Sequence, residues 1–332
     1  MNKKKIFETT VVVLCYNAEK TIKETLDSVF AQDYRYIHLI ISDDCSSDST
    51  IQMAKEWCNN YSSRFLSTEI LIQEQNQGIS RHINEVVNKV NTEWFFILAG
   101  DDIMLKDCVK SNVIYARKNN LHGIIYSNMI SFSESELKRK YKIDFEELIY
   151  QKKFGKLDSQ QQHSQLIKRE ILCSPTMFFH KSDFLLCGGC DESIRNIDDW
   201  PLKIRMTANG VKLNYFNKYT VLYRMGDSIS RSNNEYFRVS FLEEIKKVKK
   251  KYCDSYLKSD RFYMWNEKVN NLRFYVVVKI FHNRRTVLTN LINTVLALPN
   301  TDKMKKAIVN TIMMPYGKWI IKCINRKYKL EV

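Results

Sequence analysis

Apolar residues in the first 130 positions form short continuous runs that alternate with one-sided helical patterns. Between the runs, apolar residues recur every three or four positions, as from Ile22 to Phe30 and from Ile79 to Val90, which predicts helices with one buried face. The continuous, mostly β-branched or aromatic runs predict buried strands at residues 10–15, 37–42, 69–73, 94–98 and 123–126. This order of strands and helices favours an α/β fold with a mainly parallel central sheet.

The pattern changes twice beyond residue 130. Residues 133–165 are polar and weakly patterned, which predicts a variable loop or small helices over the sheet. Ordered patterning returns with a helix at 198–210 and with strands at 212–216 and 220–223. From about residue 240 the chain is Lys-rich and helical. We therefore expect an α/β domain over residues 1–240 and a basic amphipathic helical extension over residues 241–332.

The composition fits a globular chain. With 332 residues, of which 44% are hydrophobic, the chain can bury a full core, and this excludes disorder as its overall state. Nine scattered cysteines, an odd number, do not suggest a disulfide framework and suit a reducing cytoplasm. The pair Cys187 and Cys190 has no second pair at zinc-binding spacing, and the histidines include no i, i+4 ligand pair. We expect structural roles for these residues.

Positive charge is concentrated in the last quarter of the chain. Residues 241–332 hold 20 Lys and Arg against 7 Asp and Glu, so they carry 13 of the 15 net positive charges. Such a segment favours an anionic partner, either a membrane surface or a nucleic acid. Aromatic residues interleave with the basic ones and no nucleic-acid motif accompanies them, so we expect an anionic membrane surface and no nucleic acid. An ordinary solvated helical face is the alternative.

Attachment to the membrane is expected at its surface only. The longest uncharged stretch of the extension, Thr286 to Thr301, contains Asn, Thr and Pro, whereas a membrane span needs about 20 mostly apolar residues. The apolar run Val11 to Leu14 is like the core of a signal peptide, but it stops at Tyr16 and no small-residue cleavage site follows. These patterns predict a cytoplasmic protein, peripheral at the inner face of the cell membrane.

Polar side chains follow each of the first four predicted strands, at residues 15–19, 43–50, 76–81 and 99–102. Open α/β sheets bind ligands at the carboxyl ends of their strands, so these loops predict one ligand-binding rim. Helix capping explains any single loop but not four on the same rim. Within the last loop, the adjacent carboxylates of Asp101 and Asp102 repel each other unless a cation or donor lies nearby, and Mg²⁺ or Mn²⁺ suits such oxygen ligands. A solvated turn is the alternative for this pair.

Six segments, in this order and spacing, resemble the family 2 glycosyltransferases over about residues 1–230. They are VVVLCYNAEKTIKETLDSVFAQDY (11–34), HLIISDDCSSDST (38–50), NQGISRHIN (76–84), WFFILAGDD (94–102), CGGCDE (187–192) and IDDWPLKIRMTANG (197–210). The resemblance implies a GT-A fold, which is a Rossmann-like nucleotide-binding domain. It also implies transfer of a hexosyl or N-acetylhexosaminyl group from a nucleotide-sugar donor, a UDP-sugar above all.

The resemblance also implies roles for individual residues. Asp199 matches the family's proposed catalytic base, and Asp102 matches the ligand of a divalent cation, Mn²⁺ or Mg²⁺. The resemblance also implies that Asp198, Trp200 and Arg224 lie near the acceptor or the donor phosphates. Binding of the donor nucleotide is implied for Leu14, Tyr16, Asn17, Glu19, Asp44, Arg81, Asp101 and Asp102.

Two departures from the family pattern weaken this assignment. Ala99 stands where many members have a further Asp, which leaves fewer carboxylates for the metal. The His that many members have shortly after the pair matching Tyr223 and Arg224 is missing, so Arg224, Asp227 or a water would take over its role near the donor phosphates.

The implied reaction separates charge. A metal on Asp102 would stabilise the leaving diphosphate, while Asp199 would take the proton of the acceptor hydroxyl as its oxygen attacks. Attack from the face opposite to the leaving group inverts the anomeric centre. Asp198 beside it would raise the pKa of Asp199 and the helix N-terminus would lower it, and the sequence leaves this balance open. The family places such enzymes in bacterial surface-polysaccharide synthesis, such as capsule or O-antigen, with glycan or lipid-linked acceptors.

Two other readings stay open at this point. A sugar nucleotidyltransferase also has an α/β nucleotide fold, but it should show a Gly-rich phosphate loop after the first strand, and CYNAEK is not one. A catalytically degenerate membrane-docking protein would keep the fold without activity, and Ala99 and the missing His support it.

Overall fold

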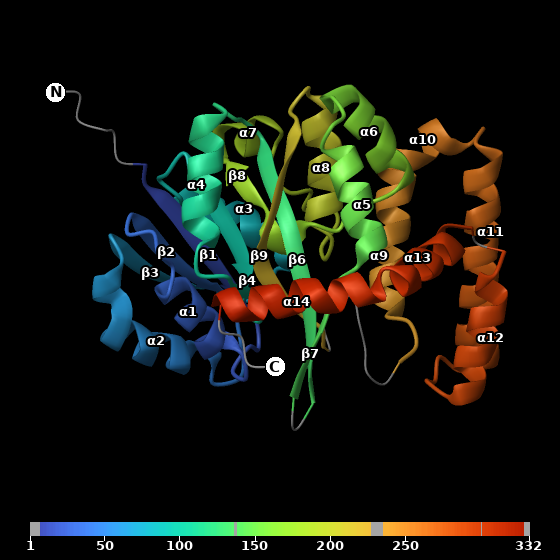
Figure 1. The fold of residues 1–332 in the computed structure, drawn as a ribbon, viewed down its shortest axis with the longest axis horizontal. Coiled ribbons are helices and arrows are strands. Elements are labelled where there is room, and N and C mark those ends of the chain that lie inside the picture. The colour runs from blue at the N-terminus through green and yellow to red at the C-terminus, as the bar shows by residue number, and fades with distance from the viewer. Residues whose placement is uncertain (1–6, 136–137, 227–234, 300, 329–332) are drawn as a thin grey trace.

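The computed structural model describes residues 7–135, 138–226, 235–299 and 301–328. One nine-stranded sheet runs through the molecule with helices on both faces (Figure 1). The strand order is β3-β2-β1-β4-β8-β6-β9-β5, and β7 pairs with β6. The strands are β1 (Thr9–Cys15), β2 (Ile37–Asp43), β3 (Ser67–Ile72), β4 (Trp94–Ala99), β5 (Ile103–Met104), β6 (Ile124–Ser135), β7 (Lys138–Lys142), β8 (Phe178–His180) and β9 (Leu213–Arg224).

Helices connect the strands and extend the chain beyond them. Two π-helical turns, Lys249–Cys253 and Val276–Ile280, interrupt the last part. The α-helices are α1 (Ile22–Phe30), α2 (Thr50–Tyr61), α3 (Ile79–Lys89), α4 (Cys108–Lys118), α5 (Phe145–Phe154), α6 (Ser159–Lys168), α7 (Lys181–Leu186), α8 (Asp199–Ala208), α9 (Val239–Val248), α10 (Asp254–Leu257), α11 (Arg261–Tyr275), α12 (Val287–Ala297), α13 (Thr301–Ile312) and α14 (Met314–Tyr328).

The predicted α/β core is confirmed over the first four strands. β1 lies between β2 and β4, and β2 pairs with β3, all in parallel. Helices cover both faces of these strands, so alternate residues of β1 enter different cores: Val12 and Leu14 join one hydrophobic cluster, and Val11 and Val13 join the other. This two-sided burial is the reason for the continuous apolar runs.

The second half of the sheet is mixed, because β8 runs antiparallel between β4 and β6. β6 is longer than predicted, and β9 joins the two strands expected at 212–216 and 220–223. The pairing of β6 with β9 shifts register at Ser127 to Met129, opposite Phe216 to Val221. The expected break at 217–219 is therefore an irregularity within one long strand.

Residues 133–165 form regular structure where a variable loop or small helices were expected. The prediction is correct for α5 and α6, which begin at the side-chain caps Asp144 and Asp158. It is wrong for the first part, where β6 and β7 form a hairpin. β7 is an edge strand that carries Lys138, Arg139 and Lys140; such charges discourage pairing with other chains and hide the strand from a hydrophobic pattern.

The C-terminal helices do not separate cleanly from the α/β core at residue 240. Val248, Cys253 and Leu257 belong to the same hydrophobic cluster as residues of β1 and β4, so the core crosses the expected boundary. The last helices, α13 and α14, pack on α5 and β6 through a third cluster that includes Phe145 and Ile324.

The end of α14 reaches the first half of the chain. The Lys327 ammonium donates to the carboxylate of Asp107 at 3.0 Å, and the Tyr328 hydroxyl donates to it at 2.6 Å. α11 and α12, by contrast, lie at the side of the molecule, away from the sheet (Figure 1). Within the described part of the chain, no helix has both the length and the apolar character needed to cross a membrane.

Candidate active site

The loops after β1 and β2 are hydrogen-bonded to each other. The Asn17 N–H donates to the Ser46 hydroxyl at 2.8 Å, and the Asn17 side-chain oxygen accepts from the Ser47 N–H at 2.9 Å. Asn17 has a left-handed backbone, φ 49°, which Asn tolerates better than most residues. The Glu19 carboxylate accepts from the Ser49 N–H at 3.2 Å. Two of the sequence-predicted nucleotide residues thus lie on one joined rim.

The other predicted residues of these loops differ in exposure. Leu14 is buried in the core, so packing is its evident role. Tyr16 is 52% exposed and is therefore accessible to a ligand. Asp44 is buried, and its carboxylate accepts from the N–H groups of Gln77 and Gly78 at 3.0 and 3.2 Å. Asp44 therefore fixes the loop that leads into α3.

The start of α3 also contacts the segment that precedes α8. The Ser80 hydroxyl donates to the carbonyl of Ile194 at 2.6 Å, and the Ser80 N–H donates to that of Arg195 at 3.3 Å. This links the first half of the site to the chain that enters Asp198 and Asp199. Arg81, in the first turn of α3, is largely exposed and pairs with Glu85 at 3.0 Å.

Asp101 and Asp102 lie beside Arg224. The carboxylate of Asp102, which is 1% exposed, accepts from the Arg224 N–H at 2.9 Å, and the Arg224 side chain donates to the Asp101 carbonyl at 2.8 Å. The same guanidinium forms ion pairs with Glu24 and Glu134. The structure thus places Arg224 near the two carboxylates as expected, but with its donors engaged by protein groups. Asp227, the other expected substitute for the missing His, lies outside the described residues.

The carboxylates of this loop fit a divalent cation that takes most of its ligands from a substrate. Ala99 contributes no oxygen, and burial raises the pKa of Asp101 although the charge of Arg224 opposes it. Asp102 is the carboxylate of this loop that would hold such an ion. Mg²⁺ in proteins is often held by one or two carboxylates together with substrate phosphates, so this donor set suits such an ion only when the diphosphate is bound.

Asp199 opens α8 and is held by a buried lysine. The fully buried Lys203 ammonium donates to the Asp199 carboxylate at 2.7 Å and to the Ile171 carbonyl at 2.6 Å. The Ser174 hydroxyl donates to the same Asp199 oxygen. Glu170 lies 3.6 Å from the Lys203 ammonium. The predicted base is thus part of a buried polar cluster.

This cluster answers the question that the sequence left open. Burial alone would raise the pKa of Asp199, but the charge and hydrogen bond of Lys203 outweigh it, and the pKa lies below its usual value. Asp198 behaves in the opposite way, because burial and then the neighbouring charge of Asp199 raise its pKa to about 7. Burial, together with the same Asp199 charge, also raises the pKa of Glu170, to about 8. At neutral pH Asp199 is therefore ionised, Asp198 is only partly ionised and Glu170 is mostly protonated.

Trp200 does not face an open cleft. Its side chain is buried in the hydrophobic core, and its indole N–H donates to the Leu166 carbonyl at 2.9 Å. In this conformation the ring cannot stack on an acceptor, and its contribution is to pack α8 against α6. In a sequence, a tryptophan next to two carboxylates suggests a residue that stacks on a ligand. Tryptophan is equally common in hydrophobic cores, and here it packs in the core.

Sequence reasoning missed the partners of Asp199. Lys203 lies four residues after Asp199 in a helix that was correctly expected, and this i, i+4 spacing was a signal that could have identified the pair. Ser174 and Glu170 come from a segment with little pattern, so their contact with Asp199 had no such signal.

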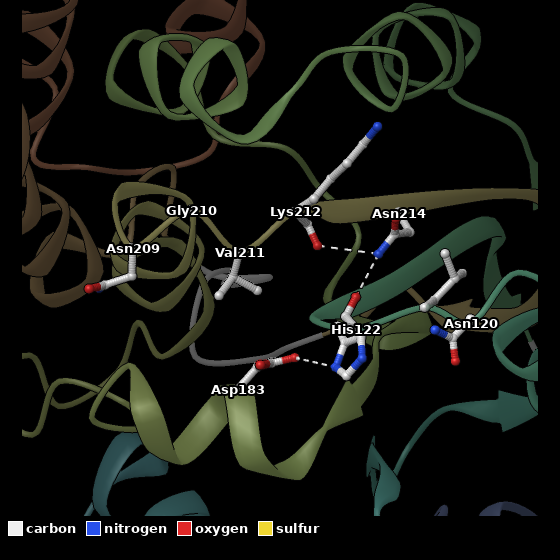
Figure 2. Close-up of a pocket in the computed structure, with 9 residues that line it drawn as sticks. Asn120, His122, Asp183, Asn209, Gly210, Val211, Lys212 and Asn214 are labelled. Carbon is white, nitrogen blue, oxygen red and sulfur yellow. Dashed lines mark hydrogen bonds and ion pairs between the residues drawn. The ribbon is translucent and has the colours of Figure 1, made fainter.

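A pocket of about 380 Å³ lies elsewhere, at the edge of the sheet where β6 and β9 begin (Figure 2). Its lining includes His122, Asp183 and Asn214, none of which was expected in a functional site. Since the polar loops described above follow the carboxyl ends of β1, β2 and β4, the pocket is at the opposite edge.

Comparison with known families assigns the first half of the chain. The model of the family described as Glycosyl transferase family 2 matches residues 10–174, from β1 to the turn before β8. The match includes the residues from Leu14 to Asp102 discussed above and ends before Asp199.

Three curated relatives match similar portions of the chain. EpsE of Bacillus subtilis (strain 168) is 24% identical over 127 residues, which is 38% of this chain and 45% of EpsE. Poly-beta-1,6-N-acetyl-D-glucosamine synthase of Staphylococcus epidermidis is 27% identical over 35% of this chain and 27% of its own length. Glycosyltransferase GlyA of Streptococcus pneumoniae serotype 4 is 29% identical over 38% of this chain and 17% of its own length. The chain thus matches less than half the length of these relatives.

Solved structures share the fold over nearly the whole chain. The crystal structure of S. aureus TarS residues 1–349 in complex with UDP-GlcNAc superposes with a TM-score of 0.53 at 14% identity, covering 94% of this chain and 92% of that one. The structure of the same TarS segment in complex with UDP gives a TM-score of 0.52. The likeness confirms the expected GT-A architecture, including C-terminal helices beyond the sheet.

Proposed function

This chain belongs to glycosyl transferase family 2 through residues 10–174, and on that premise we propose that it transfers a sugar from a nucleotide-diphosphate donor to a hydroxyl group. The observation that carries the proposal is the joined rim at the carboxyl edge of the sheet. There Asn17 ties two loops together, Asp44 fixes a third, and Asp102 stands buried at the end of β4. Ligands of open α/β sheets bind at this edge.

The donor we propose is a UDP-sugar. The rim offers an exposed aromatic ring at Tyr16 and hydrogen-bonding groups at Asn17, Glu19 and Asp44, which suit a base and a ribose. Arg81 is exposed and paired only with another surface side chain, Glu85, so it can turn toward a phosphate. The TarS structure that shares this fold is a complex with UDP-GlcNAc, which supports a hexosyl or N-acetylhexosaminyl donor.

Asp102 would hold Mn²⁺ or Mg²⁺ together with the donor phosphates, and the ion would neutralise the negative charge of the departing diphosphate. Asp199 is the proposed base for the acceptor hydroxyl. Lys203 keeps this carboxylate ionised, so it is ready to accept a proton across the physiological pH range. Attack of the acceptor oxygen on the face opposite to the leaving diphosphate makes the transfer inverting.

The acceptor we propose is a glycan or a lipid-linked glycan of a bacterial surface polysaccharide, such as capsule or O-antigen. The name of one relative, a poly-beta-1,6-N-acetyl-D-glucosamine synthase, supports a polysaccharide product.

Attachment to an anionic membrane surface at the inner face of the cell membrane fits such an acceptor. α11 and α12 expose large apolar side chains; those more than half exposed on α12 are Val287, Leu288, Leu291 and Val295. α12 itself is uncharged, and the exposed basic residues Arg284 and Arg285 lie just before it. Exposed apolar side chains next to lysines and arginines are typical of helices that lie in a membrane interface.

Calorimetric titration of UDP in the presence of Mn²⁺ tests the donor site. We expect UDP binding that chelator weakens and that Asp102→Asn abolishes, while Asp27→Asn, at a surface carboxylate of α1, binds as the unchanged chain does. Tighter binding of GDP or dTDP would support a transferase whose donor carries that nucleotide instead of UDP. Failure of the well-folded chain to bind any of the three nucleotides would contradict the proposal and favour a membrane-docking protein without activity.

A further inference from the structure

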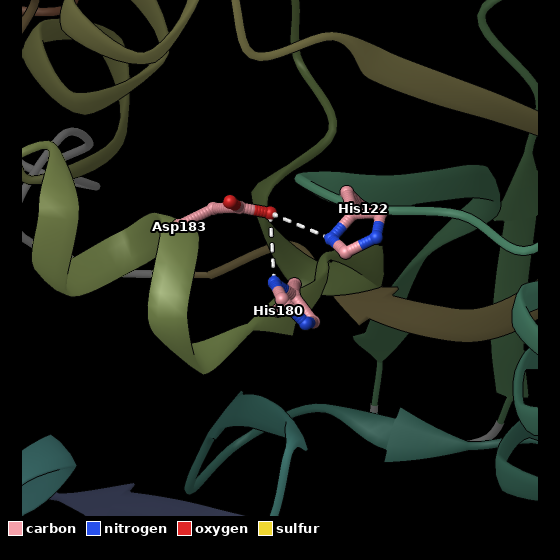
Figure 3. A group of neighbouring side chains, drawn as sticks. All are labelled: His122, His180 and Asp183. Carbon is pink, nitrogen blue, oxygen red and sulfur yellow. Dashed lines mark hydrogen bonds and ion pairs between the residues drawn. The ribbon is translucent and has the colours of Figure 1, made fainter.

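Two histidines and an aspartate meet at the edge of the sheet opposite to the proposed donor site. His180 ends β8, Asp183 lies one helical turn later in α7, and His122 lies in the loop before β6 (Figure 3). β4 separates this edge from the donor edge by six residues, which is about 20 Å of strand. The group is therefore independent of Asp102 and of the proposed reaction.

The three side chains present their ligand atoms to one another. The His180 Nδ1 lies 2.7 Å from an Asp183 carboxylate oxygen, and the His122 Nδ1 lies 3.8 Å from the same oxygen. One ligand atom from each residue lies within 4.8 Å of the others. Tetrahedral zinc, with bonds of about 2.0–2.2 Å, places neighbouring ligand atoms about 3.3–3.5 Å apart. The observed distances bracket this value, and the exposed His122 ring is free to close the difference.

Neighbouring groups orient these three side chains, as hydrogen-bond partners orient the ligands of known metal sites. Glu93 lies 3.5 Å from the His180 Nε2, which leaves the Nδ1 of His180 for the ion and orients the ring. The Gly123 N–H donates to the Asp183 carboxylate at 2.6 Å, and the His180 N–H donates to the Gly123 carbonyl at 2.8 Å. Gly123 has φ +80° and no room for a side chain, because an added Cβ would lie 2.4 Å from the Lys212 carbonyl. The loop that carries His122 is thus fixed in place.

We propose that His122, His180 and Asp183 bind a divalent transition-metal ion, with Zn²⁺ the best match to two imidazoles and one carboxylate. The ion takes the position of the hydrogen between the His180 Nδ1 and the Asp183 carboxylate, and the imidazole then carries its N–H on Nε2, toward Glu93. His122 and Asp183 also line the 380 Å³ pocket, so a water or an anionic ligand can take the fourth position from that side (Figure 2). His122 lies 58 residues before His180 and 61 before Asp183, so the ion would connect the loop before β6 to the segment formed by β8 and α7.

Titration of the full chain with Zn²⁺ and with Co²⁺, after treatment with chelator and removal of any polyhistidine tag, tests the site. We expect one equivalent per chain and the visible absorption of four-coordinate Co²⁺. His122→Gln removes an exposed ligand without disturbing the core and should weaken binding at least tenfold. His38→Gln is the matched control, because His38 also lies beside a carboxylate, Glu8 at 3.0 Å, and should bind the metals as the unchanged chain does.

Three results would overturn the proposal. They are the absence of stoichiometric binding by the unchanged chain, equal affinity of the His122→Gln variant, and an intense near-ultraviolet thiolate-to-cobalt band, which would place the ion on cysteines. Asp183→Asn provides a second variant if His122→Gln proves unstable, and it should also lower the affinity for both metals. Since UDP and Mn²⁺ are absent from these titrations, failure here leaves the proposed transferase activity unaffected.

Discussion

The protonation state of Asp199 depends on Lys203, which lies one helical turn further along α8. A fully buried ammonium needs a counter-charge, and Asp199 supplies it, so the two side chains hold each other ionised. For Asp198, one position earlier, desolvation and then the charge of Asp199 outweigh the charge of Lys203, so its pKa is raised to about 7. Adjacent carboxylates thus differ in charge state because only one of them faces the lysine.

Removing the lysine should be costly to stability. Lys203→Met leaves Asp199 as a buried carboxylate without its counter-charge, and we expect the free energy of unfolding to fall by about 3–5 kcal/mol. The double variant Lys203→Met with Asp199→Asn should recover part of this loss, because the uncompensated charge is gone. Urea unfolding measures both, with Lys118→Met at the exposed end of α4 as the control. A loss below about 1 kcal/mol in the single variant would show that the pair is not a buried ion pair.

The pH dependence of kcat for the proposed transfer should reflect the ionisation of Asp198. As pH rises through about 7, Asp198 loses its proton, and its negative charge then makes the neighbouring Asp199 a stronger base. We expect kcat to rise through this range in the unchanged chain and to lose this rise in Asp198→Asn. Measuring kcat from pH 5.5 to 8.5 at saturating donor, in the unchanged chain and in Asp198→Asn, tests this expectation. An unaltered inflection in Asp198→Asn would assign the titration to another group.

At the scale of elements, hydrophobic patterning identified the strands that are buried on both faces and the helices between them. β1, β2 and β4 were identified because each is a short apolar run bounded by polar loops. The long strand β9 was predicted as two, because the polar stretch around Asn217 falls where pairing with β6 is irregular. Likewise the loop residues of the site were found by their position after strands. The role of His122 depends on contacts between distant segments, which a local pattern does not contain, whereas the i, i+4 spacing of Asp199 and Lys203 was a local signal that was missed.

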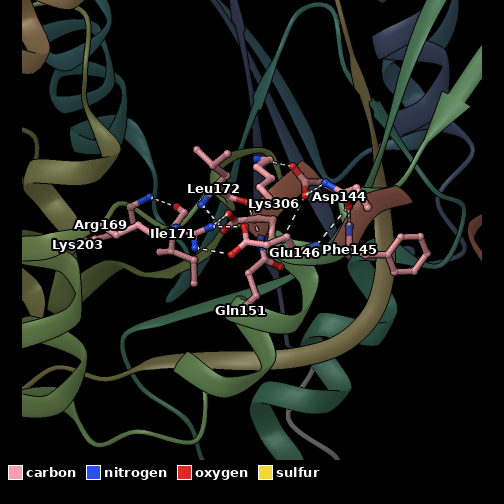
Figure 4. Close-up of polar contacts among 11 residues, drawn as sticks. Asp144, Phe145, Glu146, Gln151, Arg169, Ile171, Leu172, Lys203 and Lys306 are labelled. Atoms are coloured by element: carbon pink, nitrogen blue, oxygen red, sulfur yellow. Dashed lines mark hydrogen bonds and ion pairs between the residues drawn. The ribbon is translucent and has the colours of Figure 1, made fainter. Parts of the chain in front are cut away.

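A polar layer connects α5 to its neighbours (Figure 4). Arg169 donates to Glu146 at 2.7 and 2.8 Å, and it also bonds to Glu147. On the other side, Lys306 of α13 forms an ion pair with Asp144 at 2.6 Å. The N-terminus of α5 thus lies between the segment that supports Lys203 and the final helices.

The close packing of α14 on α5 should depend on Gly317. A Cβ at this position would lie 2.8 Å from the Phe145 ring, so a larger side chain must push the helix away. We expect Gly317→Leu to speed proteolytic cleavage of α14 while far-ultraviolet circular dichroism of the α/β core is preserved. Lys318→Leu places the same side chain on the exposed side of the helix and should leave cleavage unchanged. Equal protection of Gly317→Leu would show that α14 does not depend on this contact.

At the scale of the whole molecule, charge and exposed apolar surface gather on the same C-terminal helices. The chain carries 13 of its 15 net positive charges after residue 240, and α11 and α12 expose Trp265, Leu272 and Leu291 among others. The sheet with its loops has nearly balanced charge. The C-terminal helices are thus the part of the molecule suited to an anionic surface, separate in sequence from the loops of the rim at the carboxyl edge.

Binding to lipid vesicles should follow this division. We expect binding to vesicles that contain anionic lipid, weakened by salt because each basic residue near such a surface contributes about 1 kcal/mol. Leu288→Glu combined with Leu291→Glu should reduce sedimentation with the vesicles at least tenfold. Leu66→Glu, at an exposed leucine before β3, is the control. Equal binding of neutral and anionic vesicles, or an unaffected double variant, would contradict a membrane role for these helices.

The contact of Lys327 and Tyr328 with Asp107 has a consequence for the chain while it is being made. The partners are separated by 220 and 221 positions, so Asp107 leaves the ribosome long before the end of α14 exists. At a synthesis rate of about 5–20 residues per second, the interval is about 10–45 s. During this time the sheet must persist with the surface later covered by α14 still open. The emerging chain therefore has an aggregation-prone interval, and a chaperone that shields β6 and α5 would act in it.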